Sequence, residues 1–139
     1  MDNIIIKKIW EENDLIEIGV SIHSECVEAN VNYYVSSKSI LDCSQKICAF
    51  INNNANKCIL NFGKLGEGNV PSFKFNLFQD KTGHALIEAF FELDDGSMPK
   101  HQCSCYIRTE IGLLGKLARK FEALVNSSID TIISLLPEI

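Results

Sequence analysis

The chain lacks any long hydrophobic run, since none of its apolar stretches approaches the roughly 20 residues that a membrane-spanning helix needs. Its first residues also lack the features of a secretory signal, because the short apolar run at residues 4–6 is interrupted at once by Lys7 and Lys8. No small-residue cleavage site follows that run. We therefore expect a cytoplasmic protein that has no membrane partner.

Strong charge of either sign is also missing. The 18 aspartates and glutamates outnumber the 13 lysines and arginines, which gives a formal net charge of -5 without long runs of one sign. A nucleic-acid-binding protein would need a basic stripe, so we expect no nucleic-acid partner. The mild acidity is compatible with a basic protein partner.

The six cysteines include no Cys-x-x-Cys pair, which is the spacing typical of zinc ribbons and thioredoxin-like motifs. In the cytoplasm we expect them to be reduced thiols rather than disulfides. Their positions are Cys26, Cys43, Cys48, Cys58, Cys103 and Cys105.

The first part of the chain alternates apolar and polar residues and then changes its period. The alternation predicts strands at residues 4–10, 15–22 and 26–35. Helical spacing follows from Ser39, a candidate helix cap, to the asparagines at 52–54, which favour a turn. The apolar stripe of this helix contains Ile40, Cys43, Ile47 and Ile51, with Cys48 beside them.

The second part of the chain alternates again. It predicts four strands and a helix that begins at Thr109 and Glu110 and runs to about Val125. Apolar residues from Ser128 onward repeat at three and four, which predicts a last short helix ended by Pro137. The predicted strands are 57–63, 73–79, 84–93 and 101–108, joined by a glycine-rich loop at 63–72, a turn at 80–83 with Gly83 at positive φ, and a turn at 94–100.

These elements predict an α+β fold in the order βββαββββα, followed by the short C-terminal helix. We expect a mostly antiparallel sheet of about six to seven strands, with the two main helices packed on one face. The chain has 139 residues, is 46% hydrophobic, and shows no repeat or low-complexity linker. We therefore expect one α+β domain over residues 1–139.

The motif His-x-Cys-x-Cys at the start of the last predicted strand is a candidate metal or thiol site. His101, Cys103 and Cys105 share one face of a strand, because side chains two apart point the same way. They are weak zinc candidates, since a fourth ligand would have to come from elsewhere. Cysteine is also among the residues most often buried, so the same pattern predicts a core strand whose thiols face the following helix.

A second candidate site is a contact surface. Leu86, Glu88, Phe90 and Glu92 lie on the polar side of one predicted strand. Apolar residues on an otherwise polar sheet face indicate contact with a partner or with a second copy of the chain. For Glu88 and Glu92 the alternative is a solvated sheet face.

Several segments resemble those of small uncharacterised bacterial proteins related to the WapI-type immunity protein family. The resemblance covers about residues 16–125 and includes one short phrase around Thr-Gly-His. It implies a cytoplasmic protein that binds and blocks a toxin domain, without a catalytic residue or cofactor. The segments that carry it are "NVNYYVSS", "SILDCSQKICAFI", "FNLFQDKTGHALIEAFFEL" and "EIGLLGKLARKFEALV".

We therefore expect a non-enzymatic bacterial binding protein, whose most specific version is an immunity protein for a cognate toxin. Two alternatives stay open. One is a metal-binding or thiol-dependent protein that uses His101, Cys103 and Cys105. The other is a homo-oligomeric structural protein that associates through the face of Leu86 and Phe90.

Overall fold

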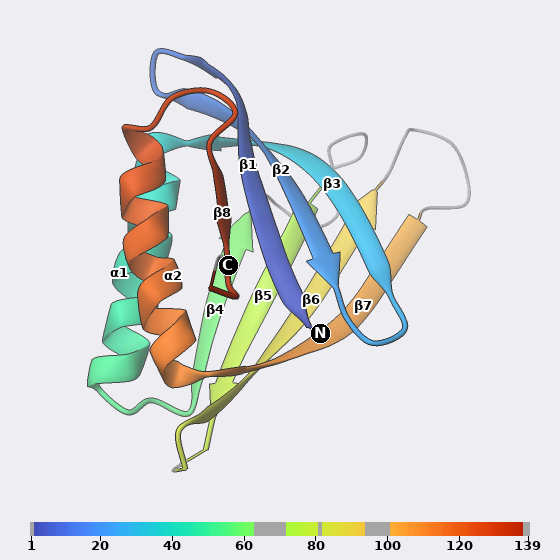
Figure 1. Cartoon of the computed structure of the whole chain (residues 1–139), viewed down its shortest axis with the longest axis vertical. Helices are drawn as coiled ribbons and strands as arrows, with labels where there is room; N and C mark the ends of the chain where they lie inside the picture. The colour runs from blue at the N-terminus through green and yellow to red at the C-terminus, as the bar shows by residue number, and fades with distance from the viewer. Residues whose placement is uncertain (1, 63–71, 81, 94–100, 138–139) are drawn as a thin grey trace.

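The computed structural model describes residues 2–62, 72–80, 82–93 and 101–137 (Figure 1). The predicted order βββαββββα is confirmed, and the chain is a single α+β domain. The elements are β1 (Asn3–Glu12), β2 (Leu15–His23), β3 (Glu28–Ser36), α1 (Ser37–Asn52), β4 (Lys57–Phe62), β5 (Ser72–Gln79), β6 (His84–Leu93), β7 (His101–Glu110), α2 (Ile111–Val125) and β8 (Ile132–Ser134).

The strands form two antiparallel sheets of four strands rather than the single sheet that we expected. The first has the order β3-β2-β1-β8 and the second has the order β4-β5-β6-β7. The inner faces of both sheets contribute to one hydrophobic core, which includes Ile18 from the first sheet and Phe75 from the second. Apart from β1, the strands alternate buried and outer residues, because each sheet has one buried face and one outer face.

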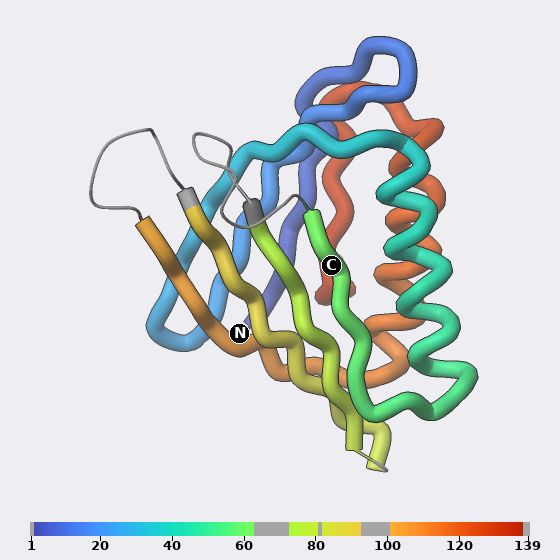
Figure 2. Tube along the Cα trace, turned by 180° about the vertical axis from the view of Figure 1, so that it is seen from behind, coloured from blue at the N-terminus to red at the C-terminus, as the bar shows by residue number. Residues whose placement is uncertain are grey.

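The two helices lie side by side along one side of the molecule, next to β4 and β8 (Figure 1). Figure 2 shows the same arrangement from behind, with β7 at the opposite side. Helix α1 buries Ile47 and Phe50, and α2 buries Leu117 and Phe121 in the common core. The helices therefore close the side of the core at which β4 and β8 lie, while β3 and β7 form the other edge of each sheet.

Helix α1 begins three residues earlier than predicted. Its N-cap is Ser36, whose hydroxyl accepts a hydrogen bond of 3.1 Å from the backbone N–H of Ser39. Ser39 was the expected cap, and it lies instead inside the first turn. Strand β3 thus passes into the helix without a loop.

The predicted C-terminal helix is wrong. Residues 132–134 form β8, which pairs with β1 through Ile5↔Ser134, Ile6↔Ile133 and Lys7↔Ile132. Helical spacing of isoleucines was the basis of the prediction, but Asp130 adopts a positive φ of 73°, which a helix does not allow. Pairing with the open edge of β1 satisfies the backbone of this segment better than one isolated turn of helix would.

The turn between β5 and β6 agrees with the sequence prediction at Gly83, whose φ is +89°. The Asp80 carboxylate accepts hydrogen bonds from the backbone N–H groups of Thr82 and His84, which hold the turn. The predicted turn at 94–100 and, apart from Ser72, the predicted glycine-rich loop lie outside the described residues.

A β-bulge interrupts the pairing of β1 with β2. Lys8 pairs with Ile18, but the next paired residue is Trp10, which lies opposite Glu17. Lys8 points into the core and is completely buried. Because the bulge inserts the extra residue Ile9, the inward alternation of Ile4, Ile6 and Lys8 ends there, and Trp10 is turned to the outer face.

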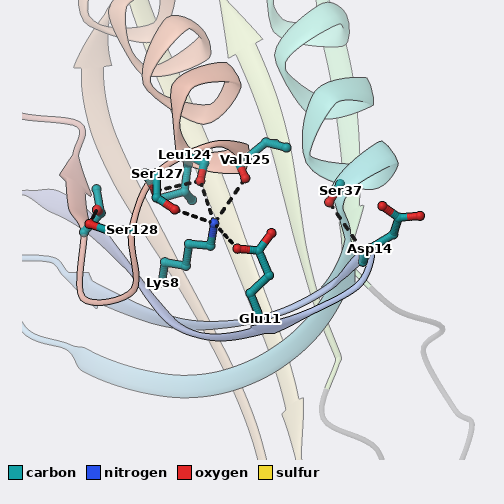
Figure 3. Close-up of polar contacts among 9 residues, drawn as sticks. Lys8, Glu11, Asp14, Ser37, Leu124, Val125, Ser127 and Ser128 are labelled. Atoms are coloured by element: carbon teal, nitrogen blue, oxygen red, sulfur yellow. Dashed lines mark hydrogen bonds and ion pairs between the residues drawn. The ribbon is translucent and has the colours of Figure 1, made fainter.

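The buried ammonium group of Lys8 holds the bulge against the end of α2 (Figure 3). Its Nζ atom donates to the backbone carbonyls of Leu124, Val125 and Ser127 at 3.3, 3.1 and 2.8 Å. It also lies 2.8 Å from the carboxylate of Glu11. A cation at the C-terminal end of a helix is favourable, because the last carbonyls there have no partner within the helix.

Candidate protein-binding surfaces

The His-x-Cys-x-Cys motif lies on β7 as predicted. His101 is exposed at the start of the strand, Cys103 is half-buried, and Cys105 is buried. Among the described residues, no three His, Cys, Asp or Glu side chains are grouped so that they could hold a metal ion. The motif is therefore a strand that passes from solvent into the core.

The thiol of Cys105 is held in its protonated form. Burial, followed by the charge and hydrogen bond of Cys103 and the charge of Asp2, raises its pKa from 9.0 to about 11. A thiolate is the form that attacks an electrophile or binds a metal, so this environment opposes both roles at neutral pH. In the part of the chain that the structure describes, the geometry around this motif does not favour the metal or thiol alternative.

We expected the thiols on this strand to face helix α2, but Cys103 does not. It lines an open groove of about 240 Å³ together with Ala29 and Val31 of β3. The groove lies between the edge strands of the two sheets. The expectation was wrong because a strand pattern shows that a face is covered without showing which element covers it.

The cysteines of α1 differ from one another. Cys43 is buried, and burial raises the pKa of its thiol to about 12. Cys48 is exposed, although we expected it to fill the core beside Ile47. Five residues along a helix rotate the side chain by more than a full turn, which takes Cys48 off the buried stripe.

The predicted contact residues Leu86, Glu88, Phe90 and Glu92 all lie on the outer face of the second sheet and are half-buried. Their neighbours across the strands are fixed by the register. Leu86 lies between Phe78 and Arg108, Glu88 between Asn76 and Tyr106, and Phe90 between Lys74 and Ser104. We call this outer face the β4–β7 face, and it also contains Lys57 and Ile59 of β4.

A row of hydrogen bonds crosses the middle of the β4–β7 face. The Asn76 amide donates to Glu88 Oε1 at 2.8 Å, and the Tyr106 hydroxyl donates to Glu88 Oε2 at 3.0 Å. These two bonds, together with the charges of Lys74 and Lys57, hold the pKa of the Glu88 carboxyl below its usual value. Glu88 is thus a fixed negative charge with both oxygens oriented.

Apolar groups surround this row. Ile59 is 41% exposed and Tyr106 is 53% exposed, so a large part of each side chain faces solvent. Lys57 lies over the ring of Phe78, with its Nζ atom 5.6 Å from the ring centroid. The β4–β7 face therefore combines exposed apolar surface with charges in fixed positions, which is the composition of many protein interfaces.

Sequence reasoning missed a second surface on the outer face of the first sheet. Trp10, Glu17 and Tyr34 lie side by side on β1, β2 and β3, because Trp10 is paired with Glu17 and Glu17 with Tyr34. The two rings contact each other edge to face, with centroids 6.2 Å apart. We call these three residues the aromatic row.

The pattern of β1 explains why the aromatic row was missed. Strict alternation from Ile4 and Ile6 places Trp10 on the inner face, whereas the bulge turns it outward. One signal was available in the sequence, because the buried series would have contained Lys8, and an uncompensated lysine inside a core is rare. A lysine in a predicted inner position therefore indicates either a charge partner or a change of register.

Neither a protein-family model nor a curated protein sequence matches this chain. A solved structure, described as "CdiA-CT/CdiI toxin and immunity complex from Enterobacter cloacae", contains a chain that is similar in structure. The TM-score is 0.46 at 9% sequence identity, over 87% of this chain and 97% of that chain. Since no family model matches, membership of the WapI-type family stays a prediction.

Within the described ranges, neither helix is long and apolar enough to cross a membrane.

Proposed function

We propose that this chain is a non-enzymatic binding protein that recognises a protein partner through the β4–β7 face. The observation that carries the proposal is the row Asn76–Glu88–Tyr106. It holds a charge in a fixed orientation among apolar side chains that are open to solvent. Pre-organised polar groups lower the cost of binding, because they need no further ordering when the partner arrives.

The most specific version of this proposal is an immunity protein that acts in the cytoplasm and neutralises a cognate toxin domain. This version rests on the resemblance of the sequence to WapI-type immunity proteins and on the mild acidity of the chain. An acidic protein is attracted to a basic toxin surface, which increases the rate of association. Such a protein needs no catalytic residue, because it acts by covering the toxin.

The experiment uses the toxin domain encoded beside this gene, if the neighbouring gene encodes one. We expect co-expression to rescue growth and titration calorimetry of the purified pair to give a saturable 1:1 complex. A housekeeping operon around the gene, or a neighbouring toxin that neither binds nor is neutralised, would contradict the immunity version.

The binding face is tested in the same titration with Tyr106→Ala. Aromatic residues at the centre of an interface often contribute more than 1 kcal/mol, so we expect affinity to fall by about tenfold or more. The matched control is Leu41→Ala, which removes an exposed side chain from α1 and should leave affinity unchanged. Equal affinities for Tyr106→Ala and the unaltered chain would remove this face from the proposal.

Light scattering of the chain alone separates the binding role from the homo-oligomeric alternative. We expect a monomer. A dimer that dissociates on Tyr106→Ala would assign the β4–β7 face to a second copy of the chain instead.

A further inference from the structure

We propose that the aromatic row of Trp10, Glu17 and Tyr34 is a second binding site, which receives an arginine side chain from a protein partner. The site lies on the outer face of the first sheet, away from the β4–β7 face. It therefore stands or fails independently of the function proposed above.

The rings of Trp10 and Tyr34 lie closer together than their backbones do. Strands β1 and β3 are separated by β2, and neighbouring strands lie about 4.8 Å apart, so the backbones of Trp10 and Tyr34 are about 10 Å apart. Their ring centroids are nevertheless only 6.2 Å apart, with an angle of 82° between the planes. The rings therefore lean toward each other across the strand that carries Glu17. An aromatic corner of this kind offers a ring face to a planar cation.

The carboxylate of Glu17 belongs to the strand between the two strands that carry the rings. Glu17 is half-buried and, among the described residues, makes no ion pair or side-chain hydrogen bond. A partly desolvated carboxylate gains most from a partner that supplies both charge and hydrogen bonds. Guanidinium does this with two parallel N–H donors, and its flat faces also stack on aromatic rings.

The surface beside Trp10 carries further negative charge. Glu12, Asp14 and Leu15 line a shallow pocket of about 460 Å³ that Trp10 also borders. Neither of these two carboxylates makes an ion pair with a described residue. The nearby Glu11 is already paired with Lys8, so it does not belong to the site. A basic segment of a partner would find complementary charge at Glu17 and at the pocket beside Trp10, and Leu15, which is 43% exposed, would add apolar contact.

The bulge in β1 provides an independent reason to regard this row as built for contact. Without it, Trp10 would continue the inward series that ends at Lys8. Bulges are frequent beside functional sites, where they re-aim a side chain. The four contacts of the Lys8 ammonium fix this bulge, so that the exposed ring of Trp10 stands on a rigid support.

The test uses the full chain and a short acetylated peptide with two arginines. Trp10 is the single tryptophan of the chain, so its fluorescence reports on this site directly. We expect a saturable change in emission, and a peptide with citrulline in place of arginine should produce none, because citrulline keeps the shape and loses the charge.

Two variants locate the binding. Glu17→Gln should lower the affinity for the arginine peptide by about tenfold. Tyr34→Leu should also lower this affinity without loss of folding, because Tyr34 is 58% exposed. The matched control is Glu122→Gln, which makes the same charge change at an exposed position of α2 and should leave affinity within about twofold. Circular dichroism confirms that each variant is folded.

The proposal is overturned if the citrulline peptide binds equally, or if Glu122→Gln weakens binding as much as Glu17→Gln. Emission that changes with protein concentration in the absence of peptide would assign the aromatic row to a second copy of this chain. That result would overturn the arginine site as well.

Discussion

A single buried lysine connects the first strand with the end of the last helix. The Lys8 side chain has no exposed surface, and its charge is compensated by Glu11 and by the carbonyls of Leu124, Val125 and Ser127. Charged groups inside a protein are stable only when their hydrogen bonds are complete. The residue therefore acts as a polar tie between two segments that lie far apart in the sequence.

Replacement of this lysine tests how much its buried contacts stabilise the fold. Lys8→Met keeps the length and apolar stem of the side chain but leaves three carbonyls and Glu11 without the ammonium group. We expect the free energy of unfolding to fall by about 2–4 kcal/mol, measured by urea denaturation with circular dichroism.

The control for this prediction is the adjacent lysine. Lys7 is paired with Asp130 at 3.5 Å on the surface, with 48% and 76% of the two side chains exposed. Exposed pairs contribute little, so Lys7→Met should change stability by less than about 0.5 kcal/mol. Similar losses for the two variants would show that the buried contacts of Lys8 do not stabilise the fold.

At the scale of elements, the junction between β3 and α1 is the place where the chain changes from strand to helix without a loop. The Ser36 hydroxyl caps the helix by accepting a hydrogen bond from the backbone N–H of Ser39. Ser36→Ala should lower the free energy of unfolding by about 1 kcal/mol, as is usual for the loss of a helix cap. Thermal or urea unfolding measures the change.

Ser39→Ala is the matched comparison, because Ser39 was the cap expected from the sequence. Its hydroxyl only accepts from that of Ser36 at 2.9 Å, so we expect a loss of a few tenths of a kcal/mol. A larger loss of stability for Ser39→Ala than for Ser36→Ala would show that Ser39 is the N-cap.

The sequence predicted the type and order of most elements, because each strand has one buried face and each helix one buried stripe. It did not predict that the strands divide into two sheets, since alternation shows which side chains face inward but not which strands pair. The C-terminal segment shows the same limit. Isoleucine and leucine residues repeat there at helical spacing, but Ile132 and Ile133 lie in a strand, because β1 offers an open edge.

The candidate sites were predictable to different degrees. Leu86 and Phe90 were assigned to the outer face correctly, because β6 alternates without interruption. The face of Trp10 was not predicted, and the bulge that turns it outward is held by the contacts of Lys8 with residues more than a hundred positions away. The local pattern shows a lysine in an inward position, but it does not show which distant residues bind that lysine.

At the scale of the whole molecule, one core joins both sheets and both helices, and it contains two buried thiols with raised pKa values. Burial also raises the pKa of the half-buried Cys58, which packs against this core. Cys43 on α1 has a pKa of about 12 and Cys105 on β7 a pKa of about 11, against 9.0 in the unfolded chain. At a pH above 9.0 but below the raised pKa of each thiol, the unfolded chain loses that thiol proton while the folded chain keeps it. Deprotonation therefore favours unfolding, and the stability present below pH 9 should decline as the pH rises toward 12.

Urea denaturation at several pH values between 8 and 11 measures this decline. Cys43→Ala should lose less stability between pH 9 and pH 11 than the unaltered chain, because one of the two thiols no longer titrates. Cys48→Ala removes an exposed thiol and should follow the unaltered chain. If Cys43→Ala and the unaltered chain lose stability in parallel, the buried thiol is not responsible.

The pairing of β1 with β8 has a consequence for protein synthesis. A ribosome releases β1 first, but the strand that pairs with its outer edge and the carbonyls that bind Lys8 lie at residues 124–134. A nascent chain that has emerged only as far as β7 therefore carries an open strand edge and a lysine without its native ligands. The first sheet is completed only after translation has passed α2, so a chain stalled before that point is exposed to edge-to-edge association and degradation.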